Sequence, residues 1–177
     1  MEVEGCLQGI CEPYNTAKVA TYSFVEYLIA DPDFAPISRT ALANFSSTAR
    51  LVAPLTPDHT AIQNAILHHL PQPNGNTNTH HALMIAGQKF QANSGPQNQR
   101  IVILLTDGLP TRYNSNGTIC RTGYSPSSPT PCTDAALAQA QALKTEGIEV
   151  FTIGLGLSQP YGEPHPGRNY LRQTTHQ

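Results

Sequence analysis

The sequence is poor in charged residues and in long apolar runs, and each shortage excludes a class of protein. Only 12% of its 177 residues are charged, the formal net charge is -2, and lysine and arginine do not cluster. A basic surface for nucleic acid or for an anionic membrane is therefore not expected. No apolar run approaches the roughly 20 residues that a membrane helix needs, and the first residues are acidic where a secretion signal would be basic. The chain as given is expected to be soluble and to carry no targeting segment.

The chain also lacks Cys-x-x-Cys, which argues against a zinc ribbon or a thioredoxin-type site. Its four cysteines form two locally spaced pairs, Cys6 with Cys11 and Cys120 with Cys132. Asparagine, glutamine, threonine and proline are common, whereas lysine and glutamate are few. This balance suits an exported protein, extracellular or at a cell surface, with local disulfides. Sequence alone cannot rank the pairings, and local spacing favours a Cys120–Cys132 clip across a long loop.

Hydrophobic periodicity predicts a chain of alternating helices and strands in one domain. Helical spacing occurs at 16–29, 57–70, 80–91 and 133–146, and strand patterns occur at 38–45, 49–55, 101–105 and 149–155. Thr56 is expected to cap the second helix, with Pro57 at its first position. The first two strands must be antiparallel because their connection is short. The later half alternates as a parallel sheet covered by helices does, so an α/β class is predicted.

Asp107 stands out because it follows five consecutive branched apolar residues, Ile101 to Leu105. Such a run fits a strand that is buried on both faces, and ligands of α/β sheets bind where these strands end. Thr77 precedes the helix at 80–91, which is expected to pack on the same sheet. A carboxylate and a hydroxyl are hard ligands suited to Mg²⁺, Mn²⁺ or Ca²⁺. Two plainer interpretations remain open: Asp107 lies in a simple turn, and Thr77 is a helix cap.

Four blocks of the sequence resemble a von Willebrand factor type A domain. They are Ala43 to Thr56, Gly75 to Leu83, Arg100 to Gly108 and Gly147 to Gly156, in the order of that family. The resemblance covers about residues 13–157, with an irregular segment at 1–12 and a polar tail at 158–177 on either side. It implies a doubly wound, Rossmann-like, mostly parallel sheet with one antiparallel edge strand and helices on both faces.

The resemblance also implies a metal-ion-dependent adhesion site. Asp107 resembles the carboxylate after the fourth strand of the family, and Thr77 resembles the hydroxyl ligand before a helix. In such a site Mg²⁺, or Mn²⁺ or Ca²⁺, keeps one position for an acidic residue of a partner protein. The implied function is a non-enzymatic protein-binding or adhesion module, of the kind attached to bacterial surface and Tad pilus-assembly proteins.

The first motif of the family, Asp-x-Ser-x-Ser, is where this sequence departs. No aspartate precedes Asp31, and Glu4, Cys6 and Gln8 occupy the slot of the motif. These residues make a poor site for a hard ion, so the chain by itself is not expected to complete the site. One explanation is that the first strand and its motif have been lost, as has a last helix after Leu171. The other is a degenerate site without metal.

Two alternative functions follow from the same residues. A metal-free interaction or scaffold domain is expected if Glu4, Cys6 and Gln8 do fill the slot of the first motif. A metal-assisted hydrolase would use Asp107 with the pair His80 and His81. The hydrolase ranks last because the sequence contains no serine elbow and no zinc-protease motif.

Overall fold

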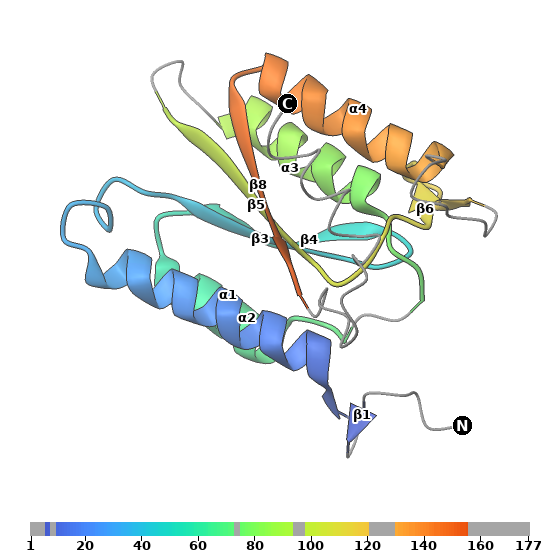
Figure 1. Cartoon of the computed structure of the whole chain (residues 1–177). Helices are drawn as coiled ribbons and strands as arrows, with labels where there is room; N and C mark the ends of the chain where they lie inside the picture. The colour runs from blue at the N-terminus through green and yellow to red at the C-terminus, as the bar shows by residue number, and fades with distance from the viewer. Residues whose placement is uncertain (1–5, 8–9, 73–74, 94–97, 121–129, 156–177) are drawn as a thin grey trace, which may run out of the picture. The chain divides into compact units, whose positions relative to one another are not determined.

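The computed structural model describes residues 6–7, 10–72, 75–93, 98–120 and 130–155 (Figure 1). The chain divides into two compact units, Met1–Asn44 with Leu51–Pro73 and Phe45–Arg50 with Asn74–Gln177. The elements in chain order are β1 (Cys6–Leu7), β2 (Ile10–Cys11), α1 (Glu12–Ala30), β3 (Thr40–Phe45), β4 (Ala49–Thr56), α2 (His59–His68), α3 (Thr79–Asn93), β5 (Arg100–Thr106), β6 (Arg112–Tyr113), β7 (Thr118–Ile119), α4 (Pro131–Thr145) and β8 (Ile148–Gly154). This order of helices and strands has the predicted α/β class.

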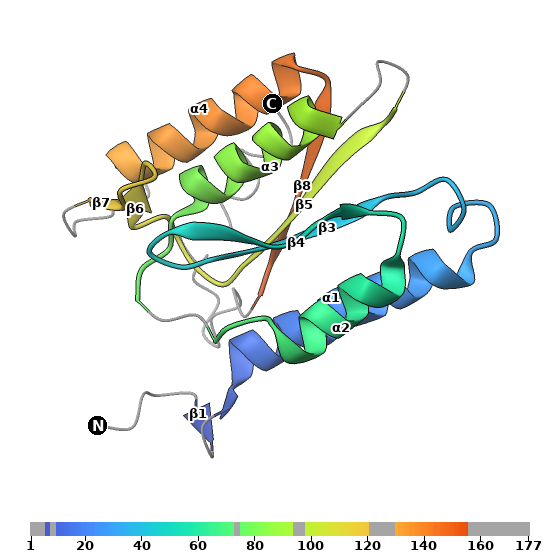
Figure 2. The same ribbon diagram turned by 180° about the vertical axis from the view of Figure 1, so that it is seen from behind.

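In the first unit, α1 and α2 lie side by side (Figure 2). The phenol of Tyr14 donates a hydrogen bond to the Leu70 carbonyl at 2.7 Å, and Nζ of Lys18 donates to the Leu67 carbonyl at 2.8 Å. Burial raises the pKa of the Tyr14 phenol. The apolar core between helices and hairpin strands consists of Val25, Leu42, Ala53, Ile62, Ala65 and Ile66.

The start of α2 corrects one sequence prediction. Thr56 is the last residue of β4, and Asp58 caps the helix by accepting a hydrogen bond from the Ala61 N–H at 3.0 Å. The Thr56 hydroxyl accepts from the Asp58 N–H instead. Strand pairing therefore holds Thr56 in the extended conformation, and an aspartate two residues later satisfies the free helical donor equally well.

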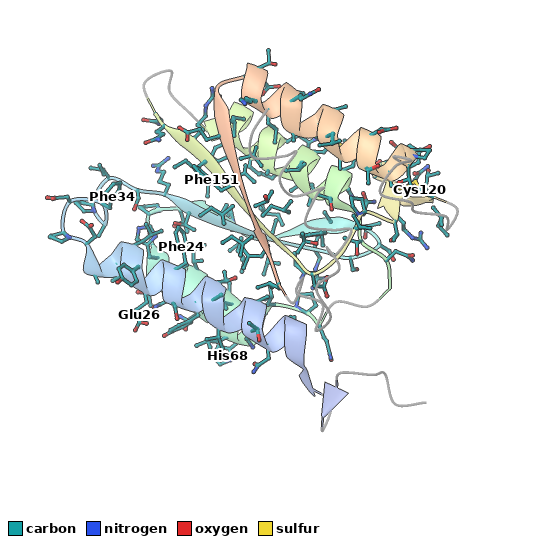
Figure 3. The ribbon with its side chains drawn as sticks, viewed as in Figure 1. Phe24, Glu26, Phe34, His68, Cys120 and Phe151 are labelled. Carbon is teal, nitrogen blue, oxygen red and sulfur yellow. A yellow bond between two sulfur atoms is a disulfide. The ribbon has the colours of Figure 1, made fainter. Side chains whose placement is uncertain are left out.

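In the second unit, β5 and β8 pair in parallel over their full lengths, from Arg100 opposite Ile148 to Thr106 opposite Gly154. One face of this pair packs against α3 and α4 through Leu83, Ala140, Leu143 and Ile148. The other face carries Ile101, Phe151 and Ile153, which are 42%, 49% and 47% exposed; Phe151 is labelled in Figure 3. Within the described residues, no strand pairs with the second edge of β5.

The long loop across which a Cys120–Cys132 clip was expected contains structure of its own. The strands β6 and β7 form an antiparallel hairpin, and α4 already begins at Pro131. Thr130 caps α4 through a reciprocal pair of bonds with Thr133. A disulfide joins Cys120, next to β7, to the buried Cys132 in the first turn of α4 (Figure 3). The hairpin is thus attached covalently to the helix.

None of the described helices is long and apolar enough to cross a membrane.

Replacing Ile62 by alanine is expected to lower the free energy of unfolding by about 2–5 kcal/mol, because it leaves a cavity in a closed core. Ile62 is 0% exposed, whereas Leu67 on the same helix is 45% exposed. Leu67→Ala is the matched control, with an expected loss of about 1 kcal/mol or less. Urea unfolding followed by circular dichroism measures both, and equal losses would contradict this assignment of the core.

Gly117→Ala is expected to destabilise the β6–β7 hairpin by about 1–2 kcal/mol or more, because its backbone is left-handed. Gly117 has φ +69°, and an added Cβ would lie 2.9 Å from the Ser47 carbonyl oxygen. Gly108→Ala is the control, since its Cβ would make only an ordinary contact of 3.8 Å. Amide hydrogen exchange in β6 and β7 reads out the difference, and unchanged protection in Gly117→Ala would refute the expectation.

Candidate functional site

Asp107 is exposed directly after a strand whose last residues are buried. Leu104 and Thr106 are each 5% exposed, and the Thr106 carbonyl accepts a hydrogen bond from the Leu155 N–H at 2.9 Å. The Thr106 hydroxyl bonds the backbone of Gly108 at 3.3 and 3.4 Å. The strand end and the turn after it are therefore fixed, and the carboxylate between them faces solvent.

Thr77 is held by its backbone, which leaves its side chain available. Its N–H donates to the Thr111 hydroxyl at 2.9 Å. Its carbonyl accepts from the N–H groups of Thr111 and Arg112 at 2.8 and 3.1 Å. In the described part of the chain the Thr77 hydroxyl has no recorded hydrogen bond, so the plainer interpretation as a helix cap is not supported.

The loop of Thr77 and the turn of Asp107 lie next to each other. A Cβ built on Gly108 would lie 3.8 Å from the Thr77 hydroxyl oxygen, with nothing nearer. Gly108 follows Asp107 directly, so the carboxylate and the hydroxyl come from neighbouring segments. The structure thus brings both candidate ligands to one region at the end of β5.

The amide of Asn78 caps α3 and ties it to two loops. Asn78 is completely buried, and its Oδ1 accepts from the His81 N–H at 3.0 Å. Its Nδ2 donates to the carbonyls of Ser47 and Asn114 at 3.0 and 2.9 Å. The neighbouring Thr79 is also buried, and its hydroxyl oxygen has no partner within the described residues. Sequence reasoning missed Asn78, although its place one residue before a helix was a usable signal.

His80 and His81 use Nδ1 to hold loops. Nδ1 of His80 accepts from the Asn114 N–H at 3.1 Å, and Nδ1 of His81 accepts from the Ala49 N–H at 3.0 Å. Burial lowers the pKa of both rings, and His81 lowers the pKa of His80 further. The hydrolase hypothesis needed these rings beside Asp107, whereas the observed bonds direct them to the β6–β7 hairpin and to β4.

Arg112 is a further residue of this region that the sequence did not reveal. Its Nη1 donates to the Gly117 carbonyl at 2.7 Å, which closes the β6–β7 hairpin. When the Asn76 amide oxygen faces the guanidinium, Nε of Arg112 donates to it at 3.0 Å. The guanidinium therefore connects the hairpin to the loop that precedes Thr77. No sequence signal marked this role, because both partners lie in irregular segments.

The slot of the first motif is described only in part. Cys6 lies in β1, directly opposite Cys11 of β2, while Glu4 and Gln8 lie outside the described residues. Across the described ranges, no cluster of three or more histidine, cysteine, aspartate or glutamate side chains is arranged to hold a metal ion. Thr77 and Asp107 are thus the only predicted ligands that the described residues place together.

Comparison with known proteins starts with solved structures, which show the fold. Proximal thread matrix protein 1 from the mussel byssus is 23% identical, with a TM-score of 0.62 over 93% of this chain and 36% of its own. The pilus adhesin SpaC from Lactobacillus rhamnosus GG is 22% identical, with a TM-score of 0.68 over 92% of this chain and 24% of its own.

Three N-terminal domains of the type V pili tip protein Mfa5 from Porphyromonas gingivalis match with 17% identity and a TM-score of 0.72. That match covers 97% of this chain and 43% of the other. This chain therefore corresponds to well under half of each of these three solved chains. One structure of the mussel protein is described as having a zinc-occupied MIDAS motif.

No curated protein matches the sequence. The family described as von Willebrand factor type A domain matches residues 12–109, more than half of the chain. The matched region contains α1, the β3–β4 hairpin, α2, α3 and β5, and it ends just after Asp107. Together with the Rossmann-like α/β fold of the solved relatives, this match shows that the chain belongs to the von Willebrand factor type A domain family.

Proposed function

We propose that this chain is a protein-binding module that docks an acidic side chain of a partner protein through a divalent metal ion. The observation that supports the proposal is the nearness of two segments: a Cβ built on Gly108 would lie 3.8 Å from the Thr77 hydroxyl oxygen. Asp107, directly before Gly108, is exposed, and the Thr77 hydroxyl has no hydrogen bond among the described residues. The domain that presents them spans residues 13–157.

The chemistry of these two donors fits a hard cation. Mg²⁺ is commonly held by one or two carboxylates and keeps several waters, while Mn²⁺ and Ca²⁺ also accept oxygen ligands. Asp107 and Thr77 would hold the ion, and its positive charge would attract a carboxylate of the partner in exchange for water. Because only these two donors come together in the described residues, the ion is expected to bind weakly until the partner completes its shell.

The surroundings of Thr77 support a preorganised site. Thr111 bonds both the N–H and the carbonyl of Thr77, and Arg112 adds a second bond to that carbonyl. These bonds fix the backbone before any ion arrives, so little conformational entropy remains to be lost on binding. The role of the chain itself is to orient the two oxygens, and no residue is assigned to bond cleavage.

A location outside the cell, at a surface or in a matrix, is part of this proposal. The Cys120–Cys132 disulfide is of the kind that persists in oxidising compartments. The similar solved structures include a pilus adhesin and a mussel byssus matrix protein, which supports an adhesive role. The partner is expected to be a protein rather than a nucleic acid, because the chain has no basic cluster.

One observation favours the metal-free alternative. Cys6, the described residue in the slot of the first motif, lies in β1 opposite Cys11 of β2. A cysteine in place of the serine of the family is a poor ligand for a hard cation. In that case the same loops would bind a partner by surface contacts alone, and the following experiment separates the two modes.

Titration with Mn²⁺ is expected to broaden the amide NMR signals of Thr77, Asp107 and Gly108 before other signals, since a paramagnetic ion acts locally. Asp107→Ala is expected to weaken this binding at least about tenfold, or about 1.4 kcal/mol, and Thr77→Val less, because it removes a neutral ligand. Asp33→Ala, which removes another exposed carboxylate, is the control. Broadening that is absent, or equal in all variants, would support the metal-free mode.

A short peptide with one central glutamate is expected to bind more tightly in the presence of Mg²⁺, and Mg²⁺ to bind more tightly in the presence of the peptide. The two effects must be equal because coupling between two bound ligands is reciprocal. A glutamine peptide is the matched control. Calorimetry of each ligand with and without the other measures the coupling, and equal affinities for both peptides would remove the acidic partner from the proposal.

A further inference from the structure

Two adjacent histidines at the start of α3 hold two different loops. His80 accepts a hydrogen bond from the backbone N–H of Asn114 in the β6–β7 hairpin. His81 accepts one from the backbone N–H of Ala49, at the start of β4. In both rings the acceptor is Nδ1. All four residues belong to the same compact unit.

This geometry requires both rings to be neutral. A backbone N–H can donate only to an Nδ1 that carries no proton, so each ring must be the tautomer with its proton on Nε2. An imidazolium carries protons on both nitrogens, and its Nδ1–H would then face the N–H of Asn114 or Ala49. A positive charge in the first turn of α3 is also opposed by the helix dipole.

We propose that His80 and His81 form an acid-sensitive clamp, in which protonation releases the β6–β7 hairpin from His80 and the start of β4 from His81. The clamp closes at neutral pH and opens in mild acid. Its two halves are separable, because each ring holds its own loop.

The direction of the pH effect follows from the folded-state pKa values. Burial lowers the pKa of both rings, and the charge of His81 lowers that of His80 further. A group with a lowered folded pKa contributes stability above its unfolded pKa of about 6.5, and this contribution is lost as the pH falls toward the folded value. The other charged groups on α3 and on the elements that contact it, or next to them, are Arg50, Lys89, Arg100, Asp107, Arg112, Asp134, Lys144, Glu146 and Glu149.

Asn78 limits the release to a local event. Its amide bonds the carbonyls of Ser47 and Asn114, close to the same two attachment points, and does not titrate. Acid should therefore loosen the loops without unfolding the unit. If the proposed function holds, loosening the hairpin also frees Thr111 and Arg112, which position Thr77, so partner docking would weaken in acid.

Amide hydrogen exchange tests the clamp without metal or partner, so a failed docking experiment would leave this test intact. The protection factors of the Asn114 and Ala49 amides are expected to fall by up to roughly tenfold per pH unit below about pH 6.5, as one proton binds each ring. Amides in β5 should keep their protection. Protection that stays constant for Asn114 and Ala49 between about pH 7.5 and 5 would overturn the proposal.

Single variants assign each half of the clamp. Asparagine places a non-titrating acceptor near the position of Nδ1, so His80→Asn should remove the pH dependence at Asn114 and leave it at Ala49. His81→Asn should do the reverse. The matched control is His68→Asn, taken from the other adjacent histidine pair, which should change neither amide. The assignment would be refuted if the protection of Asn114 still depended on pH in His80→Asn and that of Ala49 still depended on pH in His81→Asn.

Nitrogen-15 chemical shifts of the wild-type rings provide a test that needs no variant. At neutral pH both Nδ1 atoms should give the shift of an unprotonated nitrogen, and in acid both should move toward the imidazolium value. An Nδ1–H tautomer at neutral pH in either ring would contradict the hydrogen bonds on which the clamp rests.

Discussion

The second unit depends on the buried amide of Asn78. This side chain is completely buried and makes three hydrogen bonds, to the Ser47 carbonyl, the Asn114 carbonyl and the His81 N–H. The backbone N–H of Asn78 donates to the Ser46 carbonyl at 2.8 Å. A buried amide that loses a partner keeps its full desolvation cost. The hydrogen bonds of Asn78 therefore join three segments: the turn of the β3–β4 hairpin, the β6–β7 hairpin and the start of α3.

The candidate site depends on that meeting point. Thr77 precedes Asn78 directly and is bracketed by Thr111 and Arg112, which lead into the β6–β7 hairpin. The Cys120–Cys132 disulfide ties the other end of the hairpin to α4, and α4 packs with α3 on the β5–β8 pair. The irregular segments at the site are thus held in position by helices and strands, which is a usual arrangement for binding loops.

The sequence predicted the regular elements well because their signals are local. The branched run Ile101–Leu105 matches β5, the alanine-rich stretch after Cys132 matches most of α4, and the residues after Gly147 match β8. The sequence failed where two local signals competed or where an element was too short to show periodicity. Thr56 and Asp58 are both good caps, and only the length of β4 decided between them. The β6–β7 hairpin is too short for periodicity to reveal.

For the site, the order of residues alone placed Asp107 at the end of a buried strand and Thr77 ahead of a helix on the same sheet, and the family resemblance assigned both as metal ligands. Both inferences concern single segments, and the chemistry of a carboxylate or a hydroxyl is visible in the residue itself. Only the tertiary structure decided that Gly108 lies beside Thr77, that Asn78 rather than Thr77 caps α3, and that the two histidines hold loops. The capping bond of Asn78 spans only three positions, whereas the histidine bonds span 32 and 34 positions, and no local pattern encodes contacts between segments so far apart in the chain.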